Sequence, residues 1–102
     1  MFGDLLNNLK NQNQQLQQKL EQQRIEASAG NGAVTAVVNG KALLLDLRID
    51  DEKIDWQDRE QVLDLIIVAV NEAVQQAMEL ERQEGKRILE SMLPPGFGNL
   101  LG

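Results

Sequence analysis

Leucines recur at three- and four-residue spacing through the Gln-rich first part of the chain, residues 3–24. This period is typical of a helix with one narrow apolar stripe. The stripe consists of Leu6, Leu9, Leu16 and Leu20, with Asn13 and Gln23 at its remaining positions. The other faces are almost entirely Asn and Gln, which we interpret as a solvated helix surface. Because so narrow a stripe cannot fix a lone helix, we expect this helix to lie against another part of the protein.

After residue 24 the pattern changes to short apolar runs separated by turn signals. "RIEAS" (24–28) predicts a strand and "AGNG" (29–32) a turn. "AVTAVV" (33–38) and "KALLLDLRI" (41–49) then flank Asn39 and Gly40, a pair typical of a two-residue hairpin turn. The sequence therefore predicts three short antiparallel strands.

A two-residue turn at Asn39 and Gly40 fixes the expected pairing of the last two strands. It would pair Val38 with Lys41, Ala36 with Leu43 and Val34 with Leu45. One face of the sheet would then be apolar, carrying Val34, Ala36, Leu43, Leu45, Leu47 and Ile49. The other face would carry Thr35, Asp46 and Arg48 together with Val37 and Leu44. Since this second face is not wholly polar, we expect part of it to be covered as well.

Helical periodicity returns in the second half of the chain, from Trp56 to Ser91. Asp55 is the predicted N-cap, with Asp58 three residues on. At 1.5 Å per residue such a helix is about 54 Å long. A compact domain of this size has a radius of gyration near 13 Å. We therefore expect the helix to project or to pair with another chain, and infer a homodimer.

The middle of this helix, "LDLIIVAV" (63–70), is apolar nearly all round, and alanines recur every four residues at 69, 73 and 77. Small residues at this spacing let another backbone come close. The expected dimer interface comprises Leu65, Ile66, Ala69, Val70, Ala73 and Ala77. Pro94 and Pro95 cannot continue the helix. The chain thus divides into one domain, residues 1–93, and a predicted flexible tail, residues 94–102.

Composition bears on chemistry mainly through what is missing. The 102 residues include no Cys, His or Tyr, which removes the usual nucleophiles, general bases and zinc ligands. The acids near residue 50 lack the ligand spacing and glycine of an EF-hand loop. We therefore expect no enzyme activity, no metal and no cofactor. The amino terminus shows no signal-peptide pattern, and the longest apolar run is too short for a membrane span. We expect a soluble, cytoplasmic protein.

The charge distribution leaves two interpretations of the basic residues open. Net charge is −6, and six of the sixteen acidic residues lie between positions 50 and 60. The candidate phosphate-binding cations are Lys10, Lys19, Arg24, Arg82, Lys86 and Arg87. The last three lie near the end of the long helix among Glu79, Glu81, Glu84 and Glu90. They are either a solvated, salt-bridged helix face or a set of contacts to nucleic-acid phosphates.

The order of segments along the chain resembles the YbaB/EbfC family of bacterial nucleoid-associated proteins over nearly the full length. The resemblance is carried by "MFG" before a Gln-rich helix, "GAVTAVVNGKALLLDLRID", the acidic stretch, "LDLIIVAVNEAVQQA" and "LPPGF". It implies an α+β fold, α-β-β-β-α, with a small antiparallel sheet and a long C-terminal helix, in an intertwined homodimer with projecting helices. It also implies binding of double-stranded DNA and a role in nucleoid organisation and gene regulation.

Two other functions compete with DNA binding. An acidic dimeric adaptor would keep the same fold and dock onto protein partners without binding DNA by itself, and the negative charge favours it. A prefoldin-like holdase also joins two helices through β-hairpins. The first helix would be only about 33 Å long, which leaves little for a clasping coiled coil, so the holdase is the least favoured.

Overall fold

The computed structural model describes residues 2–93, and the predicted tail, residues 94–102, lies outside them. In the described part, the chain order confirms the predicted α-β-β-β-α arrangement and the α+β class. The elements are α1 (Phe2–Gln22), β1 (Ile25–Ala29), β2 (Val34–Val38), β3 (Leu44–Ile49), the short 3-10 helix η1 (Asp51–Lys53) and α2 (Arg59–Met92).

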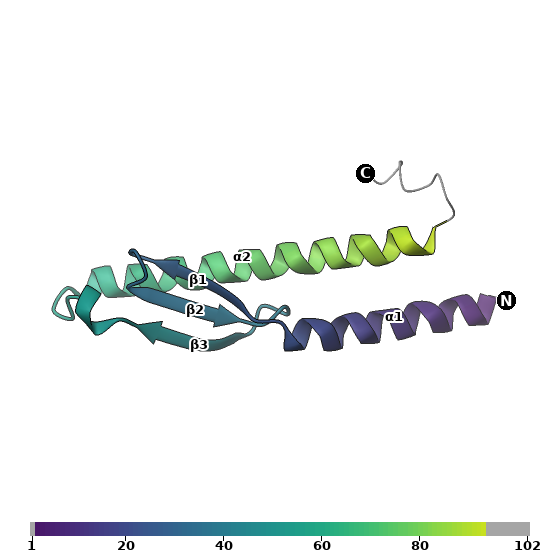
Figure 1. Cartoon of the computed structure of the whole chain (residues 1–102), viewed down its shortest axis with the longest axis horizontal. Helices are drawn as coiled ribbons and strands as arrows, with labels where there is room; N and C mark the ends of the chain where they lie inside the picture. Colours follow the sequence, from purple (N-terminus) through teal and green to yellow (C-terminus); the bar gives the residue numbers. More distant parts are fainter. Residues whose placement is uncertain (1, 94–102) are drawn as a thin grey trace.

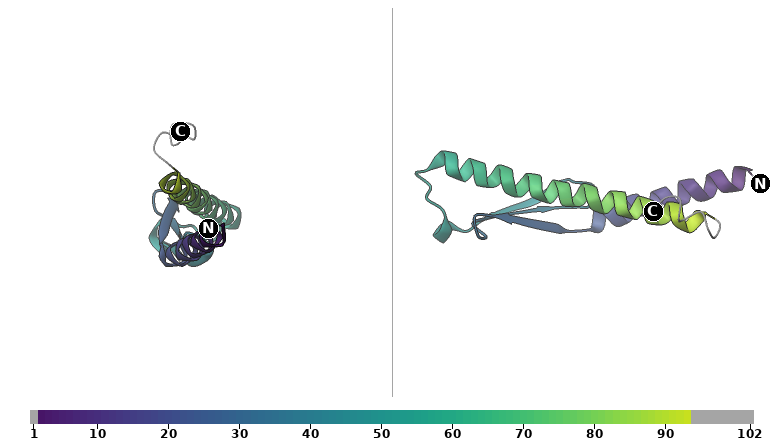
Figure 2. Two further views of the ribbon diagram at one scale, coloured as in Figure 1. Left: turned by 90° about the vertical axis from the view of Figure 1, so that its right-hand side faces the viewer. Right: turned by 90° about the horizontal axis from the view of Figure 1, so that it is seen from above.

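Helix α2 covers one face of the three-stranded sheet and continues well past its end (Figure 1). Helix α1 extends from the same end of the sheet, so α1 and the C-terminal part of α2 run out together (Figure 1; Figure 2). The molecule measures 64 × 25 × 17 Å and has a radius of gyration of 18.8 Å, compared with about 13 Å for a compact domain of 100 residues. The predicted projection of the long helix is therefore confirmed.

The turn predicted at residues 29–32 does join the first two strands, and in the structure it covers residues 30–33. The strand order is β1-β2-β3, with both pairs antiparallel. Gly30, Asn31 and Gly32 all have positive φ, a conformation that glycine adopts without steric cost. The Ala33 amide donates to the Gly30 carbonyl oxygen at 3.1 Å and closes the turn.

The predicted register between β2 and β3 is wrong. Val34 pairs with Ile49 rather than with Leu45, and Ala36 pairs with Leu47 rather than with Leu43. The reason is that Asn39 and Gly40 do not form a two-residue turn. Instead, the buried Asn39 side chain accepts the amides of residues 41 and 43, at 2.9 and 3.1 Å, and supports a wider loop over residues 39–43.

The wider loop also changes which leucines reach the core. A bulge opposite Val37 and Val38 leaves Leu45 as an extra residue in β3. Leu43 and Leu45, predicted to face the core, are 59% and 46% exposed. Leu47 and Ile49 do pack against the core, as predicted. The register therefore determines which half of the leucine-rich run is buried.

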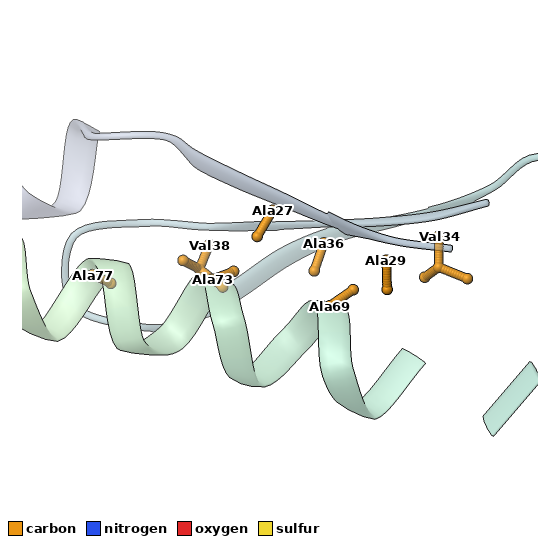
Figure 3. Packing of buried hydrophobic residues seen from close by; sticks show 8 residues of the cluster. All are labelled: Ala27, Ala29, Val34, Ala36, Val38, Ala69, Ala73 and Ala77. Carbon is orange, nitrogen blue, oxygen red and sulfur yellow. The ribbon is translucent and has the colours of Figure 1, made fainter. Parts of the chain in front are cut away.

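The core lies between α2 and the sheet and is built from small side chains (Figure 3). In Figure 3, residues of β1, β2 and α2 point toward one another: Ala27, Ala29, Val34, Ala36, Val38, Ala69, Ala73 and Ala77. The three helix alanines have no exposed surface. The alanine stripe therefore lets the backbone of α2 approach the strands of the same chain.

These contacts bear on the six residues expected at a dimer interface. Ala69, Ala73 and Ala77 are already covered within one chain, whereas Leu65, Ile66 and Val70 are only partly buried against the same core. The assignment of these residues to a dimer contact stays a prediction.

The opposite face of the sheet is covered in part, as expected. Val37 on that face is fully buried, and so is Leu20 in the last turns of α1. The Gly40 amide donates to the Leu20 carbonyl oxygen at 2.7 Å. The end of α1 is thereby held against the loop between β2 and β3, which fixes where the helix projects from the sheet.

Helix α2 begins later than predicted, and its N-cap is Asp58 rather than Asp55. The Asp58 side chain accepts the Gln61 amide at 3.3 Å, and the helix starts at Arg59. The Asp55 carboxylate instead accepts the Gln57 amide, and its carbonyl oxygen accepts the Asp58 amide. Asp55 thus closes a separate turn before the helix. Both aspartates have the residue type of a cap, so the sequence pattern could not rank them.

Candidate nucleic-acid interface

The six predicted phosphate-binding cations lie on or next to the two helices that run out beyond the sheet. Lys10 and Lys19 are on α1, and Arg24 lies in the short link between α1 and β1. Arg82, Lys86 and Arg87 lie on the C-terminal part of α2, alongside α1 (Figure 1). The fold thus gathers residues from both ends of the sequence on one part of the molecule.

Arg82 and Lys86 are paired with acids of their own helix. The Arg82 guanidinium donates to both carboxylate oxygens of Glu79, at 2.6 and 3.0 Å. Lys86 Nζ lies 3.9 Å from Glu90 Oε1. Because Arg82 donates to its carboxylate, the pKa of Glu79 lies below its usual value, and the same contact raises the pKa of Arg82.

Lys19 and Arg87 meet at a single carboxylate, that of Glu84. Lys19 Nζ lies 3.1 Å from Glu84 Oε1, and Arg87 Nη2 lies 2.8 Å from Glu84 Oε2. The Arg87 hydrogen bond, followed by that of Lys19, holds the pKa of Glu84 below its usual value. The three charged groups line a hollow of about 130 Å³ between the helices, together with Gln12, Gln15, Leu16 and Ile88.

The two remaining candidates, Lys10 and Arg24, are both exposed. Neither forms an ion pair with another residue of the described range 2–93. Their charges are therefore offset only by solvent and distant groups in this part of the chain.

The salt-bridged interpretation of the basic residues is thus an accurate description of α2. It does not exclude phosphate binding, because a phosphate offers the same kind of acceptor oxygens as a glutamate. A phosphate that binds one of these paired cations would, however, compete with its carboxylate partner.

An apolar groove of about 330 Å³ separates the tips of the two helices. Leu9 and Leu16 of the predicted stripe face Ile88, Leu89 and Met92 of α2 across it. The predicted stripe of α1 is covered only in part. Leu20 is buried where α1 meets the loop between β2 and β3, whereas Leu6 and Leu9 are 51% and 42% exposed.

Acidic side chains between residues 50 and 60 accept hydrogen bonds from nearby N–H groups of the backbone and of Trp56. Asp50 accepts the Glu52 amide at 3.1 Å and begins η1, while Asp51 accepts the Trp56 indole N–H at 3.1 Å. Residues 2–93 contain no cluster of three or more acidic side chains that could hold a metal ion. Within that range, neither helix has a stretch long and apolar enough to cross a membrane.

Glu84 is the site residue that sequence reasoning missed. Its spacing to Arg87 is visible in the sequence as an i, i+3 pair. Its contact with Lys19 joins residues 65 positions apart, and only the packing of α1 beside α2 brings them together. The sequence contains no local signal for that contact.

These features define an elongated α-β-β-β-α protein with cations on two projecting helices, and known proteins share this architecture. The crystal structure of the uncharacterized protein HP0035 from Helicobacter pylori superposes with a TM-score of 0.78, at 27% identity, covering 86% of this chain and 92% of the other. A nucleoid-associated protein of Clostridium botulinum is 42% identical over 104 residues, covering 95% of this chain and 92% of the relative. A nucleoid-associated protein of Moorella thermoacetica is 40% identical over 82 residues, covering 80% and 79%.

The family profile of the YbaB/EbfC DNA-binding family matches residues 2–92. The chain belongs to this family. The resemblance noted from the sequence segments is therefore confirmed over nearly the whole length.

Proposed function

We propose that the protein is a nucleoid-associated protein that binds double-stranded DNA as a homodimer, with little sequence preference. It acts in the bacterial nucleoid, in the cytoplasm, and contributes to nucleoid organisation and gene regulation. Membership of a DNA-binding family and the nucleoid-associated relatives support this proposal.

The observation that carries the proposal is the position of the cations on or next to the two projecting helices. Lys10, Lys19 and Arg24 on one side and Arg82, Lys86 and Arg87 on the other give phosphates six donors in one part of the molecule. Phosphate contacts position a protein on a duplex but do not read its sequence. Weak sequence preference follows.

The homodimer is supported by apolar surface that one chain leaves exposed. Leu63, Ile67 and Met78 of α2 are all more than half exposed, and with the partly buried Val70 and Val74 they follow one helical stripe. Leu43 before the edge strand β3, and Leu44 and Leu45 at its start, are exposed as well. Exposed apolar surface of this kind marks an interaction site, and a second copy would cover it.

The proposal is tested by fluorescence anisotropy of a labelled, mixed-sequence duplex across a salt series. The wild-type protein should bind with log affinity falling linearly with log salt, with a slope near −0.9 per neutralised phosphate. Replacing Arg82, Lys86 and Arg87 together by Ala should weaken binding and make the slope shallower by about 0.9 for each phosphate no longer neutralised. The matched control replaces Arg48, Lys53 and Arg59 by Ala, which also removes three positive charges but at the sheet and the start of α2, away from the projecting ends of the helices.

Equal losses in the two triple variants would contradict the site assignment, since they would show that net charge alone sets affinity. No binding by the wild type even at low salt would overturn DNA binding itself.

The acidic adaptor would then become the better-supported function, and one observation already favours it. Each candidate cation of α2 lies within 4 Å of a glutamate of the same helix, the longest of these distances being 3.9 Å. The adaptor predicts that a protein partner co-purifies with the dimer after nuclease treatment.

A further inference from the structure

Glu84 lies between two of the cations proposed to contact DNA. Its oxygens face different helices: Oε1 lies 3.1 Å from Lys19 of α1, and Oε2 lies 2.8 Å from Arg87 of α2. Its side chain is only 17% exposed, whereas the Glu79 side chain is half exposed. Glu84 is thus held between the helices rather than in open solvent.

Other ion pairs near the projecting ends are local. Arg82 pairs with Glu79 and Lys86 with Glu90, each within about one turn of α2. Among the pairs formed by residues 2–93, the contact between Lys19 and Glu84 is the one that joins α1 to α2. Replacing Glu84 would therefore affect both the charge available to DNA and the attachment of the two helices to each other.

We infer that Glu84 is an internal competitor for DNA phosphate, which holds the affinity of the protein for DNA below what its six candidate cations would give. The inference rests on the proposed function. A carboxylate and a phosphate accept hydrogen bonds from the same lysine and arginine donors. A phosphate that engages Lys19 or Arg87 must displace the Glu84 carboxylate or lie beside its charge. Where a phosphate displaces the carboxylate from Lys19, it also opens the ion pair that joins α1 to α2.

The first experiment compares Glu84→Gln with Glu81→Gln in the anisotropy assay on the same duplex. Both variants remove one negative charge from α2, so general electrostatic attraction changes equally. Glu81 is exposed and forms no ion pair with another residue of the described part. E84Q should bind the duplex more tightly than E81Q at low salt. Its salt slope should be steeper by about 0.9 for each cation released, and so by up to about 1.8.

The second experiment repeats the comparison in a background that lacks both released cations, Lys19→Gln with Arg87→Gln. There the difference between E84Q and E81Q should disappear, because no cation remains for Glu84 to occupy. A difference that persists in this background would overturn the inference. Circular dichroism of each variant checks that the helices remain folded.

The outcomes separate this inference from the function on which it rests. If the wild type binds DNA and E84Q behaves like E81Q or binds more weakly, the competition is overturned and DNA binding stands. If the wild type and every variant fail to bind, the DNA function is overturned, and the competition with it. If E84Q binds where the wild type does not, the competition is supported in its strongest form.

Discussion

The Gly40 amide donates a 2.7 Å hydrogen bond to the Leu20 carbonyl oxygen. This bond ties the last turn of α1 to the loop between β2 and β3. The approach is so close that a Cβ atom added at Gly40 would lie 2.8 Å from that oxygen and 2.9 Å from Leu20 Cα. Gly40 is not one of the glycines with positive φ. It is therefore required for space and not for backbone conformation.

Gly40→Ala should destabilise the protein by about 1–3 kcal/mol, because the added methyl group overpacks a contact between two backbone segments. The free energy of unfolding is measured by chemical denaturation at fixed protein concentration. Gly85→Ala is the matched control: it lies inside α2, and a Cβ there meets nothing within 4 Å. It should stabilise the protein by about 0.5–1 kcal/mol through helix propensity. A neutral Gly40→Ala would show that α1 is not held by this contact.

The stripe of alanines on α2 gives a second prediction. Ala73 is fully buried between the helix and the chain's own sheet, so Ala73→Leu should destabilise the fold by about 1–3 kcal/mol. Gln75→Leu adds a leucine at an exposed position of the same helix and should have little effect. Thermal unfolding at several protein concentrations distinguishes two roles of the stripe. If Ala73→Leu lowers the unfolding temperature only by removing its dependence on protein concentration, the alanine stripe packs against a second chain instead.

Most of the fold could be predicted because its patterns are local. The leucine period of α1, the glycine turn at residues 29–32 and the long apolar period of α2 each lie within one segment. The pairing of β2 with β3 could not, since the Asn39 side chain accepts two loop amides and turns a typical hairpin signal into a wider loop. Gly40 then serves the contact with α1, a use that no nearby residue indicates.

The candidate site could likewise be predicted only as far as local patterns reach. Helical spacing and sequence composition indicate which cations lie on the two helices. They do not indicate that Lys19 and Arg87 share the carboxylate of Glu84, because that depends on how α1 lies beside α2. The alanine stripe shows the same limit, since small residues predict a close backbone contact but not whether the partner is the same chain or another.

The exposed apolar stripe of α2 gives a third prediction. Ile67 is 55% exposed on the stripe, so Ile67→Asp places a charge where a second copy would pack while leaving the core of one chain intact. Light scattering after gel filtration should show the wild type at twice the 11.4 kDa chain mass and the variant at the mass of one chain. Gln75→Asp, also on the exposed surface of α2, is the control and should remain dimeric. A wild-type mass of one chain would contradict the proposed homodimer.

The paired glutamates of α2 give a fourth prediction, on pH. Hydrogen bonds from Arg82 and Arg87 hold the pKa of Glu79 and of Glu84 below the ordinary value of 4.5. Because the folded pKa lies below the unfolded one, the pairs stabilise the folded state above about pH 4.5. That contribution is lost as the pH falls through the folded pKa. Stability and the link between α1 and α2 should therefore be unchanged near neutral pH and weaken only in acid.

Carbon-13 NMR titration of the glutamate carboxyl groups measures this directly. The titration midpoints of Glu79 and Glu84 should both lie below the ordinary value of 4.5 in the wild type. Arg82→Ala should raise the midpoint of Glu79 and leave that of Glu84 in place, since Arg82 contacts only the first. Arg87→Ala should raise the midpoint of Glu84 only in part, because Lys19 still contacts the same carboxylate. If Arg87→Ala restored the ordinary value in full, Lys19 would not be bound to Glu84 in solution, and α1 would not be linked to α2 through this pair.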